Sequence, residues 1–344
     1  RLRGGSSRIS EVDEGMAFKV WVMSIVDTAM SLAEQFNPLW LLPEWLSNII
    51  LTGIKGALAL GTLVALMLYR NQNAMLYHPE IPGVGRDPAE NPKGFRSPAD
   101  YEMPFEDVTV ETSDGLKLHC WYIRQPDPQA ASAPTLIFFQ ENAGNMGLRL
   151  PSMNEFYAHL GMNIFMVSYR GYGRSQGSPT EEGLQLDAQA VLDHVWNRND
   201  LDKTRLVILG RSLGGAVSVY VTNQNPEKVR GLILENTFTS IPDMVDVVMP
   251  WVAPLKGLVL RIGWKSLERI PTITTPILFV SGRRDELVPP QHMDGLYLAA
   301  TKSIYKAKHE VANGRHNDTW QKNTAAYNSA VRAFMLRIGA SAPL

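Results

Sequence analysis

The sequence predicts an α/β fold in which a mostly parallel, doubly wound sheet follows an N-terminal transmembrane helix. Short, almost wholly apolar runs recur from residue 105 onward, and stretches of helical periodicity separate them. Strands of this kind are buried on both faces, which is typical of parallel sheets. Upstream lies one apolar run that is long enough to cross a membrane and carries a single charge. Together these observations predict a membrane-anchored α/β protein.

Composition and charge limit the possible functions. The 344 residues carry a formal net charge of -1, so the chain lacks the basic excess that nucleic-acid binding usually requires. The single cysteine, Cys120, excludes an intrachain disulfide and a multi-cysteine zinc site. Residues 1–7 contain RLRGG, which is similar to the tail of ubiquitin, and are left out of the fold prediction.

The N-terminal part of the chain divides into three segments. Residues 49–70 predict a transmembrane helix, because the only charge before Arg70 is Lys55 and no amphipathic face is present. Tryptophans and sparse charges in residues 1–48 predict an arm with interfacial helices. Six prolines in residues 71–104 predict an extended tether to the folded domain.

Flanking charges predict the orientation of this single-pass protein. Basic residues follow the apolar run, whereas Glu34 and Glu44 precede it without a basic neighbour. The positive-inside rule then favours a cytosolic C-terminal domain, although it gives no indication of the organelle. The basic residues are Arg70, Arg86, Lys93 and Arg96.

Residues 105–340 predict the sheet domain. Residues 105–123 predict two strands joined by a Ser-Asp-Gly turn. Buried strands and helical stretches then alternate, as in a doubly wound sheet, whose ligands bind at the carboxyl ends of the strands. The predicted buried strands are 135–140, 163–169, 205–210, 231–236 and 276–282.

The pattern G-x-S-x-G occurs twice, as GRSQG at 173–177 and as GRSLG at 210–214. It indicates a nucleophile only where the serine lies on a sharp turn between a buried strand and a helix. Ser175 lies several residues after its strand and shortly before Pro179, which describes a loop. Ser212 follows RLVILG after one residue and leads directly into an apolar helix. The predicted nucleophile is therefore Ser212.

A serine hydroxyl requires a base, and the base requires an orienting group. Asp285 follows the strand at 276–282, at the same sheet edge as Ser212, and is the predicted acid ahead of Glu286. His316 lies in the loop NGRHND before the closing helix and is the predicted base. His309, at the end of the preceding strand, is the fallback.

Several motifs together resemble the α/β-hydrolases of the Bem and ABHD membrane-anchored type, over residues 105–338. The resemblance implies an α/β-hydrolase fold, with Ser212 as nucleophile, Asp285 as acid and His316 as base. The motifs are RGYGRSQGSPT, GRSLGG, ENTFTSI, SGRRDELVPP and GRHND.

The resemblance also implies an oxyanion hole. One donor is the backbone N–H of Leu213, and the other comes from the loop after residues 135–140. Asn142 is the first candidate for that second donor and Glu141 is the second candidate. The family usually has His-Gly-Asn-Ala-Gly-Asn there, whereas this chain has Gln-Glu-Asn-Ala-Gly-Asn. An inward-pointing Glu141 carboxylate would oppose a developing oxyanion.

An insertion at 239–275 predicts a short helical cap. Four of its apolar residues are equally good candidates for an acyl groove and for ordinary helix packing. They are Met249, Trp251, Leu255 and Leu258.

The expected function is that of a serine hydrolase that forms an acyl-enzyme and requires no metal or organic cofactor. The anchor, the cap and the resemblance favour an acyl ester or thioester as substrate, in a lipid or an acylated protein. Two alternatives stay open: a serine peptidase of the prolyl-oligopeptidase-like branch, and a catalytically silent membrane scaffold. The glycosylation sequon Asn317-Asp318-Thr319 adjoins His316, where a glycan would crowd the site, and so favours the cytosol.

Overall fold

The computed structural model describes residues 24, 27, 28, 31 and 42–341. It divides the chain into two units, Arg1–Asn71 and Gln72–Leu344. Most of the N-terminal arm, with its predicted interfacial helices, lies outside the described residues.

The apolar run forms helix α2, Glu44–Leu76, which extends beyond the predicted 49–70 at both ends. Pro43 precedes the helix. Glu44 lies in the first turn, where its negative charge interacts favourably with the positive end of the helix dipole. The mean hydropathy of its most apolar window is 2.0, and none of that window is buried. Within the described part of the chain, α2 is the one helix long and apolar enough to cross a membrane.

The second unit contains one eight-stranded sheet in the order β1-β2-β4-β3-β5-β6-β7-β8. Strands β1 and β2 form the predicted antiparallel hairpin, and β2 also pairs antiparallel with β4. All other neighbours pair in parallel. The strands are β1 Phe105–Glu111, β2 Lys117–Ile123, β3 Thr135–Phe139, β4 Asn163–Val167, β5 Leu206–Arg211, β6 Gly231–Glu235, β7 Ile277–Gly282 and β8 Lys306–Val311.

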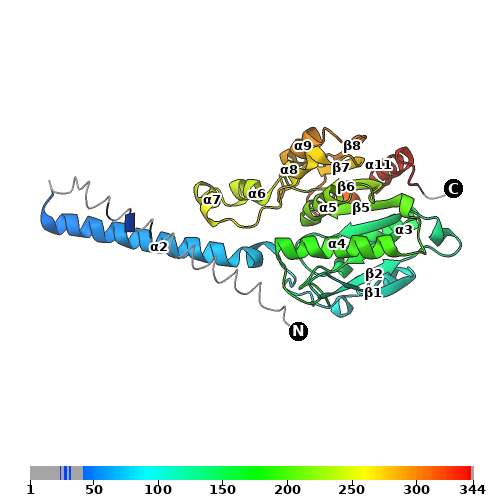
Figure 1. The fold of residues 1–344 in the computed structure, drawn as a ribbon, viewed down its shortest axis with the longest axis horizontal. Helices are drawn as coiled ribbons and strands as arrows, with labels where there is room; N and C mark the ends of the chain where they lie inside the picture. Colours follow the sequence, from blue (N-terminus) through cyan, green and yellow to red (C-terminus); the bar gives the residue numbers. More distant parts are fainter. Residues whose placement is uncertain (1–23, 25–26, 29–30, 32–41, 342–344) are drawn as a thin grey trace. The chain divides into compact units, whose positions relative to one another are not determined.

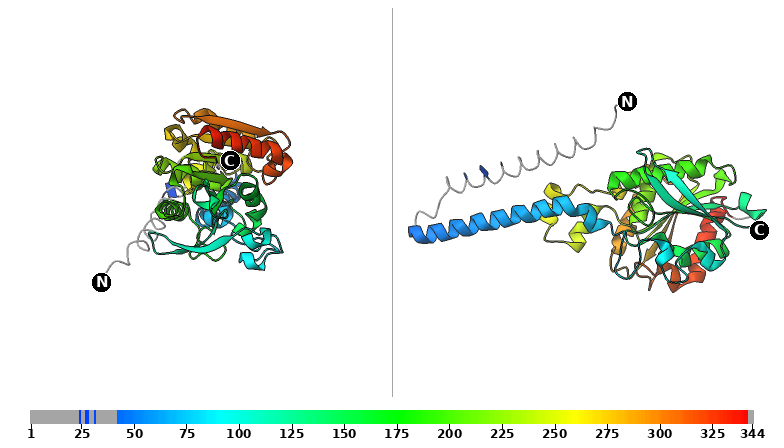
Figure 2. Two further views of the ribbon diagram at one scale, coloured as in Figure 1. Left: turned by 90° about the vertical axis from the view of Figure 1, so that its right-hand side faces the viewer. Right: turned by 90° about the horizontal axis from the view of Figure 1, so that it is seen from below.

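Helices cover both faces of the sheet, as the doubly wound prediction requires (Figure 1 and Figure 2). Every residue of β3 to β7 is buried, because each of these strands lies between two helical layers. One layer contains α4 Glu181–Asn197, α5 Leu213–Gln224 and α9 Pro290–Ala299. The other contains α3 Leu150–Ala158 and α11 Thr324–Arg337, which α10 Thr319–Lys322 precedes. The predicted α/β fold is thereby confirmed.

The predicted cap occupies the connection between β6 and β7. Ser240 starts it, because its hydroxyl accepts from the backbone N–H of Asp243 and caps α6. Glu181 of α4 holds its far end by accepting from the backbone N–H groups of Gly263 and Trp264, at 2.6 and 2.9 Å. The cap helices are α6 Ile241–Val248, α7 Lys256–Val259 and α8 Ser266–Arg269, with 3-10 turns at Ala253–Leu255 and Ile270–Thr272.

Residues 72–104 differ from the extended tether that the prolines predict, because they belong to the second unit. Tyr77 and Met103 are buried in its core, and the side chains of Asn91 and Asn145 bond to each other at 2.8 and 3.0 Å. Pro88 and Pro98 each start a short 3-10 turn, where the missing N–H costs nothing. The remaining 3-10 turns among the described residues are Pro88–Glu90, Pro98–Tyr101, Gln129–Ala131, Met146–Arg149 and Lys203–Arg205.

Candidate active site

Ser212 lies on the sharp turn between β5 and α5. Its backbone has φ +53° and ψ -121°, in a region that residues with a side chain rarely adopt. Two hydrogen bonds hold this conformation: Ser212 N donates to Glu235 O at 3.0 Å, and Thr237 Oγ1 donates to Ser212 O at 2.7 Å. The turn therefore presents the Ser212 side chain at the carboxyl end of the sheet.

Two glycines permit the close approach of strand and helix at this turn. A Cβ at Gly210 would collide with Gly214 O and with the Ser218 hydroxyl. A Cβ at Gly214 would collide with the carbonyl oxygen of Phe139, at the end of β3. The G-x-S-x-G spacing thus follows from backbone contact between β5, α5 and β3.

The three residues predicted as nucleophile, base and acid meet in this structure. His316 Nε2 lies 3.0 Å from Ser212 Oγ, and His316 Nδ1 lies 2.8 Å from Asp285 Oδ2. The other carboxylate oxygen, Asp285 Oδ1, accepts from the backbone N–H groups of Leu287 and Val288 at 2.9 and 2.8 Å. With Nδ1–H donating to Asp285, Nε2 is left as the acceptor for the serine proton.

Asn236 connects the elements that carry these side chains. Its φ is +47°, and its side chain accepts from Gly282 N at 2.8 Å, at the end of β7. Its amide nitrogen donates to His316 O at 3.0 Å and to Thr319 Oγ1 at 2.8 Å. Sequence reasoning assigned Asn236 no role and placed it as the last residue of the predicted strand 231–236, whereas β6 ends at Glu235.

The serine of the first G-x-S-x-G motif has a different environment. Ser175 Oγ donates to Ser168 O at 2.7 Å and accepts from His119 N at 2.8 Å, so it joins two chain segments. The fallback base, His309, lies within β8, and its Nε2 is buried without a partner among the described residues. His292 on α9 instead lies 2.8 Å from the hydroxyl of Thr239.

The loop after β3 contains both candidates for the second oxyanion donor. Among the described residues, no hydrogen bond uses the backbone N–H of Leu213 or of Asn142, so both groups are available to an incoming oxygen. Asn142 is held by its other groups: Asn142 O accepts from His78 N at 2.9 Å and from Tyr172 OH at 2.7 Å. Its Nδ2 donates to Leu76 O at 2.8 Å.

Glu141 is neutralised by two arginines. Arg149 Nε lies 2.7 Å from its carboxylate, and Arg211 Nη1 lies at 3.3 Å. Arg211 also pairs with Glu235 at 3.0 Å, and Glu235 accepts from the Tyr327 hydroxyl at 2.9 Å. Burial opposes the charge of Glu141, but the two guanidinium groups outweigh it and lower its pKa from 4.5 to about 2.

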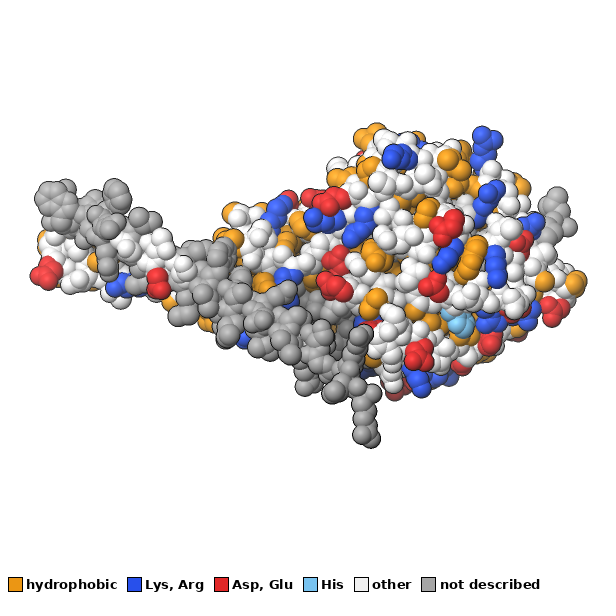
Figure 3. Space-filling model, in the orientation of Figure 1, with side chains coloured by type: hydrophobic (Ala, Val, Ile, Leu, Met, Phe, Trp, Pro, Cys, Tyr) orange, Lys and Arg blue, Asp and Glu red, His pale blue; other side chains and the backbone are white. Residues whose placement is uncertain are grey.

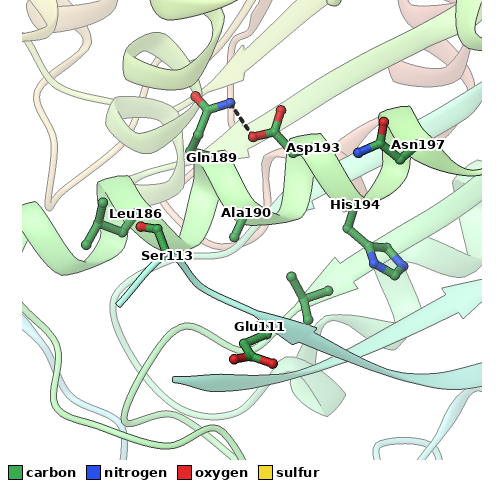
Figure 4. Close-up of a pocket in the computed structure, with 9 residues that line it drawn as sticks. Glu111, Ser113, Leu186, Gln189, Ala190, Asp193, His194 and Asn197 are labelled. Atoms are coloured by element: carbon green, nitrogen blue, oxygen red, sulfur yellow. Dashed lines mark hydrogen bonds between the residues drawn. The ribbon is translucent and has the colours of Figure 1, made fainter. Parts of the chain in front are cut away.

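Two pockets lie away from Ser212. One, of about 350 Å³, lies between β1 and α4, where Glu111 and Ser113 face Asp193 and His194 (Figure 4). The other, of about 530 Å³, is lined by residues at the amino ends of β5, β6 and β7. The described residues contain no group of three or more His, Cys, Asp or Glu side chains that could hold a metal ion.

The sheet, the covering helices and the elbow at Ser212 define the chain as an α/β-hydrolase. Residues 134–257 match the family described as the alpha/beta hydrolase fold. The esterase Pf2001 of Pyrococcus furiosus has the same fold, with a TM-score of 0.60 at 19% identity over 76% of this chain and 99% of that one.

Closer relatives define the family. The alpha/beta hydrolase domain-containing protein WAV2 of Arabidopsis thaliana is 41% identical, over 76% of this chain and 86% of the relative. Protein bem46 of Schizosaccharomyces pombe is 40% identical, over 75% of this chain and 84% of its own length. The uncharacterized membrane protein YNL320W of Saccharomyces cerevisiae is 36% identical over 83% of this chain and 96% of its own. The chain therefore belongs to the Bem46-type α/β-hydrolase family, as the motifs predicted.

We expect Arg211→Met to lower the free energy of unfolding by about 3–5 kcal/mol, because it leaves the buried carboxylate of Glu235 without its cation and removes one of the two cations from Glu141. Arg174→Met is the matched control. Arg174 precedes the other motif serine, and its side chain is 46% exposed in its pair with Asp87, so its loss should cost about 1 kcal/mol or less. Denaturant unfolding measures both, and equal losses would contradict a special role for Arg211.

The lowered pKa of Glu141 predicts a pH dependence of stability. The folded carboxylate stays ionised below the pKa of about 4.5 that the unfolded chain has. The ionised carboxylate therefore contributes its full stabilisation of the fold above pH 4.5, and this contribution is lost as the pH falls toward about 2. Glu141→Gln removes this term, so the stability difference between wild type and variant should shrink between pH 5 and pH 3, by on the order of 1–3 kcal/mol. A difference that stays constant over that interval would contradict the pairing.

Proposed function

We propose that the chain is a membrane-anchored serine hydrolase that cleaves acyl esters or thioesters. The observation that carries this proposal is the hydrogen-bonded series from Ser212 through His316 to Asp285, on a strained turn at the carboxyl edge of the sheet. Such a series lets a neutral imidazole remove the proton of the serine hydroxyl while a carboxylate stabilises the imidazolium.

The reaction then runs in two halves. His316 Nε2 takes the proton as Ser212 Oγ bonds to the acyl carbon, and the backbone N–H groups of Leu213 and Asn142 receive the oxyanion. The carbon–oxygen or carbon–sulfur bond breaks, and the leaving alcohol or thiol takes the proton from His316. Water repeats the sequence on the acyl-enzyme, which releases a carboxylic acid and restores the Ser212 hydroxyl. The ion pairs of Glu141 support this assignment, because they remove a free negative charge from beside the oxyanion.

The membrane assignment is supported by the length and hydropathy of α2. An anchored enzyme with a cap meets acyl groups that are themselves membrane-bound, so we propose a lipid or an acylated protein as the substrate. This proposal differs from the peptidase alternative in the bond that is cleaved, which is an acyl ester or thioester bond and not a peptide bond.

Labelling with a fluorophosphonate probe tests the nucleophile. We expect the wild type to be labelled and Ser212→Ala to lose labelling, because the probe bonds to an activated serine. Ser175→Ala is the matched control and should label like the wild type. Labelling that survives in Ser212→Ala would refute the site, and an unlabelled wild type would favour the silent scaffold.

The same proteins separate the substrate classes. Acid release from acyl thioesters or esters, dependent on Ser212, supports the proposal, whereas cleavage of peptides alone would favour the peptidase.

The arginines that follow the apolar run, Arg70, Arg86 and Arg96, support a cytosolic hydrolase unit. We therefore expect external protease to digest this unit in sealed microsomes without detergent. Protection of the unit until the membrane is permeabilised would place it in the lumen instead.

A further inference from the structure

Five large apolar residues at the tip of the cap are exposed. This cap patch consists of residues at the end of α6, in the turn that follows and on α7. Other exposed apolar side chains in the second unit are scattered singly, which is normal for a soluble surface. Figure 3 shows apolar side chains at the surface over α7. The patch residues and their exposed fractions are Val247 49%, Val248 63%, Trp251 62%, Leu255 45% and Leu258 47%.

This exposure changes the interpretation of the insertion. Trp251, Leu255 and Leu258 were candidates for ordinary helix packing, yet about half of each side chain is in contact with solvent. Burying such side chains against an apolar phase would be favourable by about 25 cal/mol for each Å² removed from water. Tryptophan in particular favours the boundary between an apolar phase and water.

The charges beside the patch fit a lipid surface. Residues 247–267 contain three basic side chains and no acidic one. Two of the three make ion pairs at the surface, Lys256 with Asp246 and Lys265 with Glu268, and exposed pairs of this kind are weak. Lys256 at the start of α7 and Arg261 shortly after its end place basic groups next to apolar side chains, as in segments that lie in the headgroup layer.

A buried side chain ties the cap to the end of the apolar helix. Gln72 Nε2 donates to Val259 O at 2.7 Å, and Gln72 Oε1 accepts from Arg261 N at 2.7 Å. Gln72 belongs to the same helix as the apolar run 49–69 and follows it by three residues. The first residue of the second unit, close after the apolar run in the sequence, is therefore bonded to the cap.

The first residues of the cap also lie close in the sequence to a residue that contacts Ser212. Thr237, which bonds to Ser212 O, lies three residues before Ser240, the residue that starts α6. The residues after Gln72 continue to the oxyanion loop, where Leu76 O and His78 N both bond to Asn142. The same short segment thus contacts both the cap and the loop that is proposed to bind the oxyanion.

We propose that the cap patch inserts into the bilayer that holds α2, and so places the entrance to the Ser212 site at the headgroup layer. This surface would let an acyl chain pass from the bilayer to the site without crossing water. The inference rests on the proposed membrane anchor, and its occupant is the lipid bilayer rather than a second copy of the chain.

Fluorescence from a single labelled cysteine tests this inference in the full chain. Cys120 is fully buried, so a surface cysteine reacts selectively with a thiol-directed NBD label. We would label Trp251→Cys and, as the matched control, Ile304→Cys, which is 77% exposed before the amino end of β8, whereas the cap follows the carboxyl end of β6. Both proteins are reconstituted into phosphatidylcholine and phosphatidylserine vesicles, at a ratio of about 4:1, that contain nitroxide-bearing lipids.

We expect nitroxide lipids to quench a several-fold larger fraction of the label at position 251 than at 304, and aqueous iodide to show the reverse order. Equal quenching by the lipid at both positions overturns the inference. Protection of position 251 from iodide without lipid quenching also overturns it, because another protein surface then covers the patch.

Carbonate extraction of the same vesicles distinguishes the two proposals. If the chain resists extraction but lipid does not quench the label at position 251, the membrane anchor is supported and the insertion of the cap patch is refuted. If carbonate releases the chain, both the membrane anchor and the insertion of the cap patch are refuted. The fluorophosphonate reaction of Ser212 is measured separately, so the fate of the catalytic assignment is independent of either outcome.

Discussion

The backbone at Ser212 is the constraint on which the site depends. A residue with a side chain in this conformation costs about 1–3 kcal/mol, and the structure must supply that free energy elsewhere. It does so through the contact of Gly214 with the end of β3 and through the hydrogen bonds from Ser212 N and to Ser212 O. The strands on either side of β5 thus hold the serine in place, and a loosened sheet would release it.

The residue before Ser212 extends this constraint into the core. Arg211 lies under the turn and joins the loop after β3, through Glu141, to the end of β6, through Glu235. A buried ion network of this kind contributes little net stability, yet it is intolerant of losing one member. Its geometric effect is to hold the loop after β3, the turn at Ser212 and the end of β6 at fixed separations.

The sequence predicted the parts of the molecule that local patterns determine. Apolar runs identified the buried strands, and the residues between strand and helix distinguished Ser212 from Ser175. The pairing of Glu141 with Arg149 and Arg211 could not be predicted, because it joins residues far apart in the chain and depends on side-chain direction. Asn236 was missed for the same reason: an asparagine at the end of a strand has no pattern that reveals partners at the end of β7 and just before and at the start of α10. The prolines of 71–104 suggested a tether because their distribution carries no information about packing partners.

The packing of residues 72–104 moves the beginning of the folded unit well ahead of its first strand. Trp264 Nε1 donates to the Tyr77 hydroxyl at 2.9 Å, and Asn145 Nδ2 donates to Gly85 O at 2.9 Å. A fragment truncated at β1 would lose these acceptors together with Gln72, and would leave buried donors without partners in the cap and beside the oxyanion loop. A fragment that keeps all of these contacts therefore has to begin within the last turns of α2.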